Sequence, residues 1–152
     1  MKYIVILLSF GLLACSNTNS LSNTELNASY RHYIANQPLE SHDKINSFKF
    51  RGWQALSNDF LILSSSPKRK YLVEINGFCN DLKFAQSLIV NRSTNTSLRT
   101  RFDSIATVDM PEMNCFIKAI YPINKAQAKE IAALDDKDSV SAADEHVIEE
   151  KS

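Results

Sequence analysis

The spacing of apolar residues changes along the chain, and each change predicts a structural element. The first helical spacing follows a capping box formed by Ser22 and Glu25. Its apolar residues are Leu26, Tyr30, Tyr33 and Ile34. Because Pro38 ends the pattern, we predict a short amphipathic helix before it. A second capping box, Asn124 with Gln127, opens a helix predicted to run to Leu134, with an apolar stripe at Ala128, Ile131 and Ala132.

Between these helices the apolar period becomes two, which is typical of strands with one buried face. Phe48 and Phe50 share one face, and Trp53 appears on the other face after Gly52. A glycine at the point where the alternation flips predicts a β-bulge.

The remaining strands are predicted from short apolar runs separated by turn residues. Residues 59–63 are apolar on both faces, which favours a central strand, and a basic turn at residues 67–70 leads into the next strand. That strand ends at Asn76-Gly77, a strong turn dipeptide. We predict further strands at residues 87–90, 98–108 and 115–121, one helical turn at 81–85, and an end to the last strand at Pro122.

These elements predict an α+β fold with about six antiparallel strands in a curved meander or roll. An N-terminal and a C-terminal helix flank the strands, and the chain carries no internal repeat. We place this single domain at residues 24–134.

The N-terminal residues have the pattern of a lipoprotein signal peptide. Lys2 precedes an apolar run from Tyr3 to Leu13 that is too short to span a bilayer, which needs about 20 residues. Ala14 and Cys15 follow as in a bacterial lipobox, where the cysteine thiol receives acyl chains such as palmitate. We therefore predict a leader at residues 1–14 and a lipidated Cys15.

The predicted anchor places the protein on a membrane rather than in it. Ser16 stands where an Asp commonly marks inner-membrane retention, which favours the periplasmic face of the outer membrane over the inner membrane. Residues 15–23, rich in Ser and Asn, are predicted to be a flexible tether. The alternative is a plain secreted protein in which Cys15 is incidental.

Charge is balanced overall, with 17 basic and 17 acidic residues, but it is unevenly spread. The tail at residues 135–152 holds seven acidic residues and is predicted to be disordered, which leaves the body mildly basic. We interpret this excess as a solvated surface that falls short of the clustered basic face of nucleic-acid-binding proteins. We therefore expect no nucleic-acid partner.

Cys79 and Cys115 are the cysteines that remain for the oxidising compartment. A bridge between them would close a loop of about 37 residues and stabilise the fold by roughly 4 kcal/mol. The alternative is a reactive thiol pair, although no Cys-x-x-Cys spacing is present to lower a thiol pKa.

A family resemblance is carried by Trp53, residues 71–75, the block 79–85, the triplet Arg101-Phe102-Asp103 and residues 115–120. Through these blocks, residues 45–122 resemble the domain-of-unknown-function family DUF6491, uncharacterised envelope lipoproteins of Gram-negative bacteria. The resemblance implies a lipoprotein of unassigned activity in which the paired cysteines belong to the framework. It supplies no catalytic residue.

No catalytic or metal-binding pattern is present in the sequence. His32, His42 and His146 have no metal-ligand spacing, and we interpret each as solvated. Three glycines in the whole chain exclude both a nucleophile elbow and a phosphate-binding glycine loop. We therefore expect neither enzymatic activity nor a cofactor or metal.

One candidate anion-binding site lies in the predicted strand at residues 98–108. Arg99, Arg101 and Asp103 would share one face of that strand, where two guanidiniums can hold an anion. Alternatively, Asp103 bonds a turn or pairs with Arg101 as scaffold, which is the interpretation we favour. Arg51 also lies close enough in sequence to Trp53 for a cation–π contact.

Two functional hypotheses follow, and an enzyme that uses Glu74, Asp81 or Asp103 is a third that we do not favour. The first is a non-enzymatic lipoprotein that serves as an interaction or structural module and binds a protein or a cell-wall component at the membrane surface. The second is a small-ligand carrier whose curved sheet encloses an apolar or anion-binding pocket, the apolar form lined by Phe48, Phe50, Phe60 or Tyr71.

Overall fold

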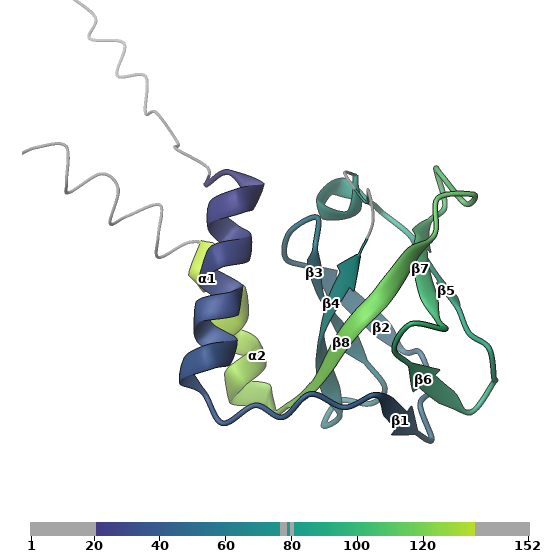
Figure 1. The fold of residues 1–152 in the computed structure, drawn as a ribbon, viewed down its shortest axis with the longest axis horizontal. Helices are drawn as coiled ribbons and strands as arrows, with labels where there is room; N and C mark the ends of the chain where they lie inside the picture. The colour runs from purple at the N-terminus through teal and green to yellow at the C-terminus, as the bar shows by residue number, and fades with distance from the viewer. Residues whose placement is uncertain (1–20, 77–78, 80, 136–152) are drawn as a thin grey trace, which may run out of the picture.

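The computed structural model describes residues 21–76, 79 and 81–135. Two helices lie against one side of a curved sheet (Figure 1). The elements in chain order are α1 (Asn23–Asn36), β1 (Lys44–Asn46), β2 (Gly52–Ala55), β3 (Phe60–Ser64), β4 (Lys70–Asn76), the 3₁₀ turn η1 (Leu82–Phe84), β5 (Leu88–Asn91), β6 (Ser97–Arg99), β7 (Ser104–Thr107), β8 (Cys115–Ile123) and α2 (Lys125–Ala132). The predicted leader, Cys15 and the tail from residue 136 lie outside the described residues.

Six strands form one antiparallel sheet in the order β2-β3-β4-β8-β7-β5, which curves until it is nearly closed. β1 and β6 pair separately as a two-stranded ribbon, with Ile45 opposite Leu98. The predicted α+β class, with antiparallel strands between two flanking helices, is confirmed.

The sheet buries both of its faces, and the alternation of β3 shows how. Leu61 and Leu63 point into the curve of the sheet, whereas Phe60 and Ile62 point towards the helices. All four are buried, which explains why residues 59–63 lack polar positions. Ile45 and Leu98 belong to the inner core, so the β1–β6 ribbon covers the open side of the curve.

The N-terminus of α1 is fixed by the capping box that the sequence predicts. Ser22 Oγ accepts a hydrogen bond from the backbone N–H of Glu25 and donates one to the Glu25 carboxylate, at 2.7 Å from Oε2. This hydrogen bond lowers the pKa of the Glu25 carboxyl. Leu26 and Tyr30 are fully buried against the sheet, and Tyr30 packs on Phe60 with 5.5 Å between ring centroids.

Polar contacts fix α1 on the turn between β2 and β3. Asn27 Nδ2 donates to Asp59 Oδ2 at 2.7 Å, and Ser57 Oγ donates to Asn27 Oδ1 at 2.6 Å. Further along the helix, Arg31 reaches the buried Glu74 carboxylate at 3.3 Å, and Lys118 approaches the same oxygen at 2.8 Å. These bonds set the position of α1 along the sheet.

The second helix begins at the predicted capping box of Asn124 and Gln127 and ends at Ala132, two residues before the predicted end. Ile131 of α2 is fully buried. Tyr33 Oη of α1 donates to Glu130 Oε2 of α2 at 2.9 Å. Burial of the phenol and this acidic partner raise the pKa of Tyr33 to about 12.

The Cys79–Cys115 disulfide is present and connects the chain after β4 to the start of β8. These strands pair from Lys70 opposite Ile123 to Asn76 opposite Phe116, so the bridge lies at the Phe116 end of their ladder. The β2–β3 turn lies at this end too, because Ile75 N donates to Asp59 O at 2.9 Å. We call the disulfide, η1, the β2–β3 turn and the β7–β8 loop the disulfide end.

The single strand predicted at residues 98–108 is wrong, because a turn divides it into β6 and β7. Arg101 has a φ of 66°, a left-handed conformation that a non-glycine residue adopts only when other contacts hold it. The Asp103 carboxylate supplies such contacts by accepting hydrogen bonds from the backbone N–H groups of Ser93 (2.7 Å) and Arg99 (2.8 Å).

Two further boundary predictions are also wrong. Pro122 lies inside β8 rather than after it. Proline is tolerated there because β7 pairs only with the first residues of β8, so the edge of β8 that faces β7 needs no amide donor at Pro122. Gly52 begins β2 in regular register with β3 and forms no bulge, whereas the register shift of the sheet occurs between Glu74 and Ile75. The stretch with Phe48 and Phe50 lies outside the strands.

Candidate functional site

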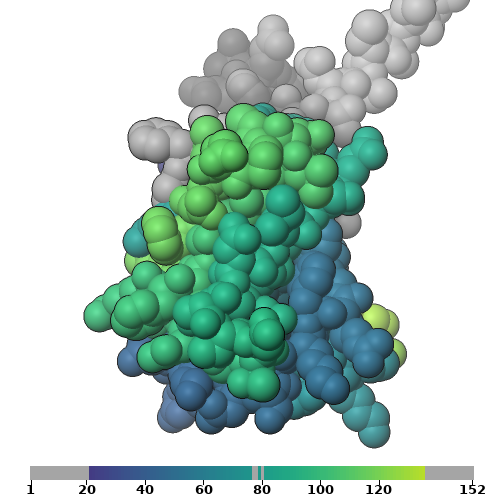
Figure 2. All heavy atoms as spheres, turned by 90° about the vertical axis from the view of Figure 1, so that its right-hand side faces the viewer, coloured from purple at the N-terminus to yellow at the C-terminus, as the bar shows by residue number. Residues whose placement is uncertain are grey.

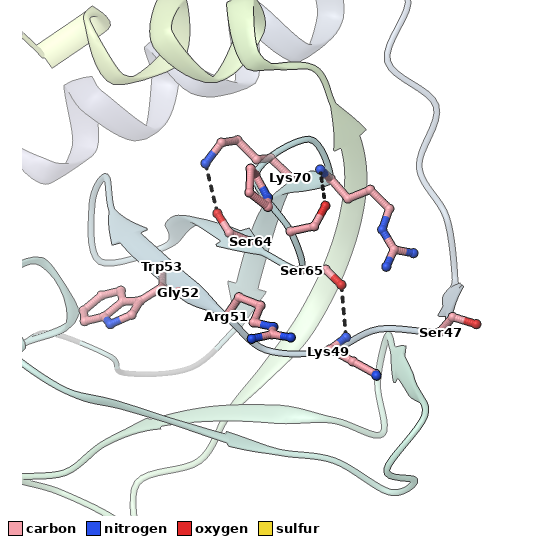
Figure 3. A pocket seen from close by; sticks show the side chains of 11 residues that line it. Ser47, Lys49, Arg51, Gly52, Trp53, Ser64, Ser65 and Lys70 are labelled. Carbon is pink, nitrogen blue, oxygen red and sulfur yellow. Dashed lines mark hydrogen bonds between the residues drawn. The ribbon is translucent and has the colours of Figure 1, made fainter.

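A basic groove lies at the end of the molecule opposite the disulfide end. It has a volume of about 1020 Å³, and Figure 3 shows the side chains that line it. Its basic residues are Lys49 and Arg51, which precede β2, and Arg69 and Lys70, at the start of β4. The rest of its lining is Ser47, Gly52, Trp53, Ser64, Ser65, Ser66 and Pro67.

The β3–β4 turn holds its basic residues outward through serine hydrogen bonds. Ser66 Oγ accepts from the backbone N–H groups of Lys68 (3.3 Å) and Arg69 (3.0 Å), and Ser65 N donates to Arg69 O at 2.9 Å. Pro67 suits this turn because its ring fixes φ. The backbone is thus satisfied locally, and both basic side chains are exposed.

The segment before β2 forms the other wall of the groove. Lys49 N donates to Ser65 Oγ at 3.0 Å, and Arg51 N donates to Ser64 O at 2.9 Å, so this wall is attached to the end of β3 (Figure 3). Phe48 anchors the segment because its ring is fully buried, 5.8 Å from the ring of Tyr71.

Two smaller depressions adjoin the groove and share Lys70 with it. One, of about 380 Å³, adds Lys44 and Lys68, and the other, of about 240 Å³, adds Lys125 and Lys129 from α2. The three depressions together collect eight of the fourteen lysines and arginines in the described part. We call this set the basic end: Lys44, Lys49, Arg51, Lys68, Arg69, Lys70, Lys125 and Lys129.

The basic end lacks compensating negative charge. No Asp or Glu lines any of its three depressions. Among residues 21–76, 79 and 81–135, the ion pairs all involve Arg31, Lys83 or Lys118 and none of the eight basic residues. Lys70 Nζ instead donates to Ser64 Oγ at 3.0 Å. The arrangement can attract an anion and hydrogen-bond its oxygens.

The predicted site residues Arg99, Arg101 and Asp103 do not share a strand face. Asp103 is fully buried and bonds two backbone amides, whereas Arg99 stacks on Phe102 with its guanidinium carbon 4.8 Å from the ring centroid. Arg101 lies in the turn between the strands and is exposed.

The four aromatic residues predicted to line a carrier pocket do not surround one cavity. Phe48 and Tyr71 belong to the inner core, Phe60 to the core beneath the helices, and Phe50 is 36% exposed. Of the histidines, His32 and His42 are exposed, and His146 lies outside the described residues. Within the described residues, no three His, Cys, Asp or Glu side chains are grouped to hold a metal ion.

The basic end escapes prediction from the sequence because its members are spread from Lys44 to Lys129. The basic turn at residues 67–70 was the local signal, and the serines before it were a second one. The contributions of Lys44 and the α2 lysines depend on tertiary structure. The structure gathers eight basic residues at one end, which the sequence did not predict, and the expectation of no nucleic-acid partner stays a prediction.

A family model described as "Family of unknown function (DUF6491)" matches residues 1–139. The chain belongs to the DUF6491 family. The resemblance seen in the sequence is thereby confirmed at the level of the family. For this DUF6491 protein, no match is found among curated proteins or solved structures. No helix in its described part is long and apolar enough to cross a membrane.

Proposed function

We propose that this protein is a non-enzymatic, membrane-anchored envelope lipoprotein that binds an extended anionic polymer at its basic end. The observation that carries the proposal is the cluster of eight basic residues around three depressions that no carboxylate lines. Like charges held together repel one another and destabilise the folded state, so an anionic ligand that neutralises them is attracted strongly.

The spread of the basic residues favours an extended ligand over a single small anion. They come from β1, the segment before β2, the β3–β4 turn, the start of β4 and α2, and their three depressions share Lys70. Six of the eight are lysines, which act as flexible point charges rather than as a fixed bidentate fork. Such a surface suits repeated anionic groups, as in a cell-wall polymer.

The position of α1 supports a partner beyond the anchoring membrane. Asn58 N donates to Asn23 Oδ1 at 3.3 Å, so α1 begins at the disulfide end. A chain anchored at Cys15 would enter the domain there, and the basic end would face away from the lipid headgroups. This orientation presents the basic end to the space beside the membrane.

The binding test compares two double variants that remove the same charge. We expect the wild-type chain to bind linear polyphosphate, and Arg51→Ser with Arg69→Ser to weaken this binding at least tenfold. The matched control, Arg99→Ser with Arg101→Ser, should retain wild-type affinity. Titration calorimetry at low and high salt measures both. Equal losses in the two variants, or equal binding of inorganic phosphate at the same phosphate concentration, would contradict an extended site at the basic end.

The anchor has its own test. Cys15→Ala should remove the protein from the membrane fraction, because the acyl chains are the anchor that the sequence predicts. Fractionation with a high-salt wash measures this directly. A Cys15→Ala variant that still pellets with membranes after the wash would refute the lipid anchor while leaving the binding test intact.

A further inference from the structure

Three large apolar side chains project from η1 and the β7–β8 loop at the disulfide end. Phe84 of η1 is 77% exposed, and Val108 and Met113 of the β7–β8 loop are 54% and 40% exposed. Phe84 and Val108 line one shallow depression, and Figure 2 shows the green β7–β8 loop at the upper end of the described surface. We call Phe84, Val108 and Met113 the apolar tip.

The apolar tip lies outside the two hydrophobic cores of the domain. η1 is instead held by Leu82, which is fully buried, and by the neighbouring disulfide. Large apolar side chains that gather on the surface of a monomer typically mark a contact surface.

The chain enters and leaves the described domain at this same end. α1 begins beside Asn58 of the β2–β3 turn, and Asp135, after α2, pairs with Lys83 of η1 at 3.4 Å. Five residues lie between Cys15 and Leu21, so six Cα–Cα steps join them. Fully extended, they span about 21 Å. A lipid on Cys15 would therefore hold the apolar tip close to the bilayer.

We propose that the apolar tip rests in the surface of the bilayer that anchors Cys15. This inference rests on the lipid anchor of the proposed function and goes beyond it by fixing the orientation of the domain. Asp81, Asp109 and Glu112 are exposed near the tip, and Lys83 is paired. Contact with lipid therefore comes from apolar burial rather than from charge and should be insensitive to salt.

The test supplies the anchor chemically. With Cys79 and Cys115 bridged, Cys15 is the thiol that remains in the mature chain, so the protein can be coupled through it to a maleimide lipid in phosphatidylcholine vesicles. Phe84→Trp places a reporter on the tip, and Phe102→Trp places one on a side chain that is 65% exposed elsewhere. The unsubstituted chain gives the Trp53 baseline.

We expect brominated lipids to quench the tryptophan at position 84 at least twofold more than the one at position 102, equally at low and high salt. Equal quenching at both positions, or quenching that salt abolishes, would overturn the proposal. A dimer in sedimentation equilibrium that Phe84→Ser dissociates would also overturn it, by assigning the tip to a second copy of the chain. Because coupling replaces natural lipidation, these outcomes are independent of the Cys15→Ala test.

Discussion

The two ends of the domain use the same kinds of charged residue in opposite ways. Towards the disulfide end, cations are paired: Arg31 lies between Asp59 and Glu74, Lys118 contacts Glu74, and Lys83 contacts Asp135. At the basic end, the eight basic residues have no carboxylate partner in the described part.

This difference separates cations that hold the fold together from cations that are available to a ligand. A paired cation offsets the burial of its carboxylate, as Lys118 and Arg31 do for Glu74, whose side chain is only 7% exposed. An unpaired cation contributes little to folding and gives its full attraction to an incoming anion. Substitutions at the two ends should therefore affect different properties, stability at one and binding at the other.

The largest expected effect is at the disulfide. Replacing both cysteines, Cys79→Ser with Cys115→Ser, should lower the free energy of unfolding by roughly 4 kcal/mol, because the bridge restricts the unfolded chain. Urea denaturation without reductant measures the loss. Polyphosphate binding by the fraction that remains folded should be unchanged. A loss of less than about 1 kcal/mol, small for a disulfide of this loop length, would contradict a stabilising role for this end.

The next effect is at Asp103, whose carboxylate holds the turn between β6 and β7. Asp103→Asn should cost about 2 kcal/mol, since two backbone amides lose a charged acceptor in a buried site. Asp109→Asn, at an exposed carboxylate, is the control and should be nearly neutral. Thermal unfolding of the wild-type chain and the two variants measures both effects. If Asp103→Asn is as stable as Asp109→Asn, the carboxylate does not hold the turn.

Local sequence signals predicted the elements that local chemistry controls. Both capping boxes gave helix starts that the structure confirms, at Ser22 and Asn124. The continuous apolar run at residues 59–63 predicted β3, which pairs along its full length with β4. The basic turn before β4 and the Asn76-Gly77 dipeptide after it predicted the bounds of β4. The break between β6 and β7 escaped prediction because Asp103 bonds the distant Ser93 amide, a contact that no periodicity records.

The contact between the helices should have a smaller effect, which depends on pH. Tyr33 donates to Glu130, and Tyr33→Phe should cost about 0.5–1 kcal/mol at neutral pH. Because the folded pKa of Tyr33 is raised to about 12 from 10.0, the folded state keeps its proton longer than the unfolded state. Stability should therefore fall as pH rises from about 10 to 12.

The predicted loss of stability at alkaline pH has a direct control. Tyr33→Phe should flatten the stability curve over that range, and Tyr121, whose pKa is raised by burial and then by Glu74, should account for part of what remains. Chemical denaturation at a series of pH values, with phenolate absorbance as a second readout, follows both. An unchanged curve in Tyr33→Phe would mean that the phenol titrates alike in both states.

The smallest expected effect is at the basic end, where the substitution should raise stability rather than lower it. Removing one of the clustered charges, Arg69→Ser, should raise stability by a few tenths of a kcal/mol at low salt, because like charges nearby no longer repel. The gain should vanish at about 1 M salt, where the Debye length is about 3 Å. A loss of stability at low salt would indicate that Arg69 has a structural partner.

The candidate site was less predictable than the fold for a physical reason. Periodicity and capping are properties of neighbours in sequence, whereas the basic end is assembled from the β1, β4 and α2 regions. The arginines singled out in the sequence, Arg99 and Arg101, were neighbours on a supposed strand. The structure places one against Phe102 and the other in a turn.

The most direct test of the division between the two ends is an NMR titration of the chain with linear polyphosphate. The amides of residues 49–51, 64–66 and 68–70 should shift progressively, and the shifts should weaken with salt. The amides of Phe84, Val108 and Met113 should stay in place. Shifts centred on Arg99 and Arg101, or none at residues 64–70, would contradict a binding role for the basic end.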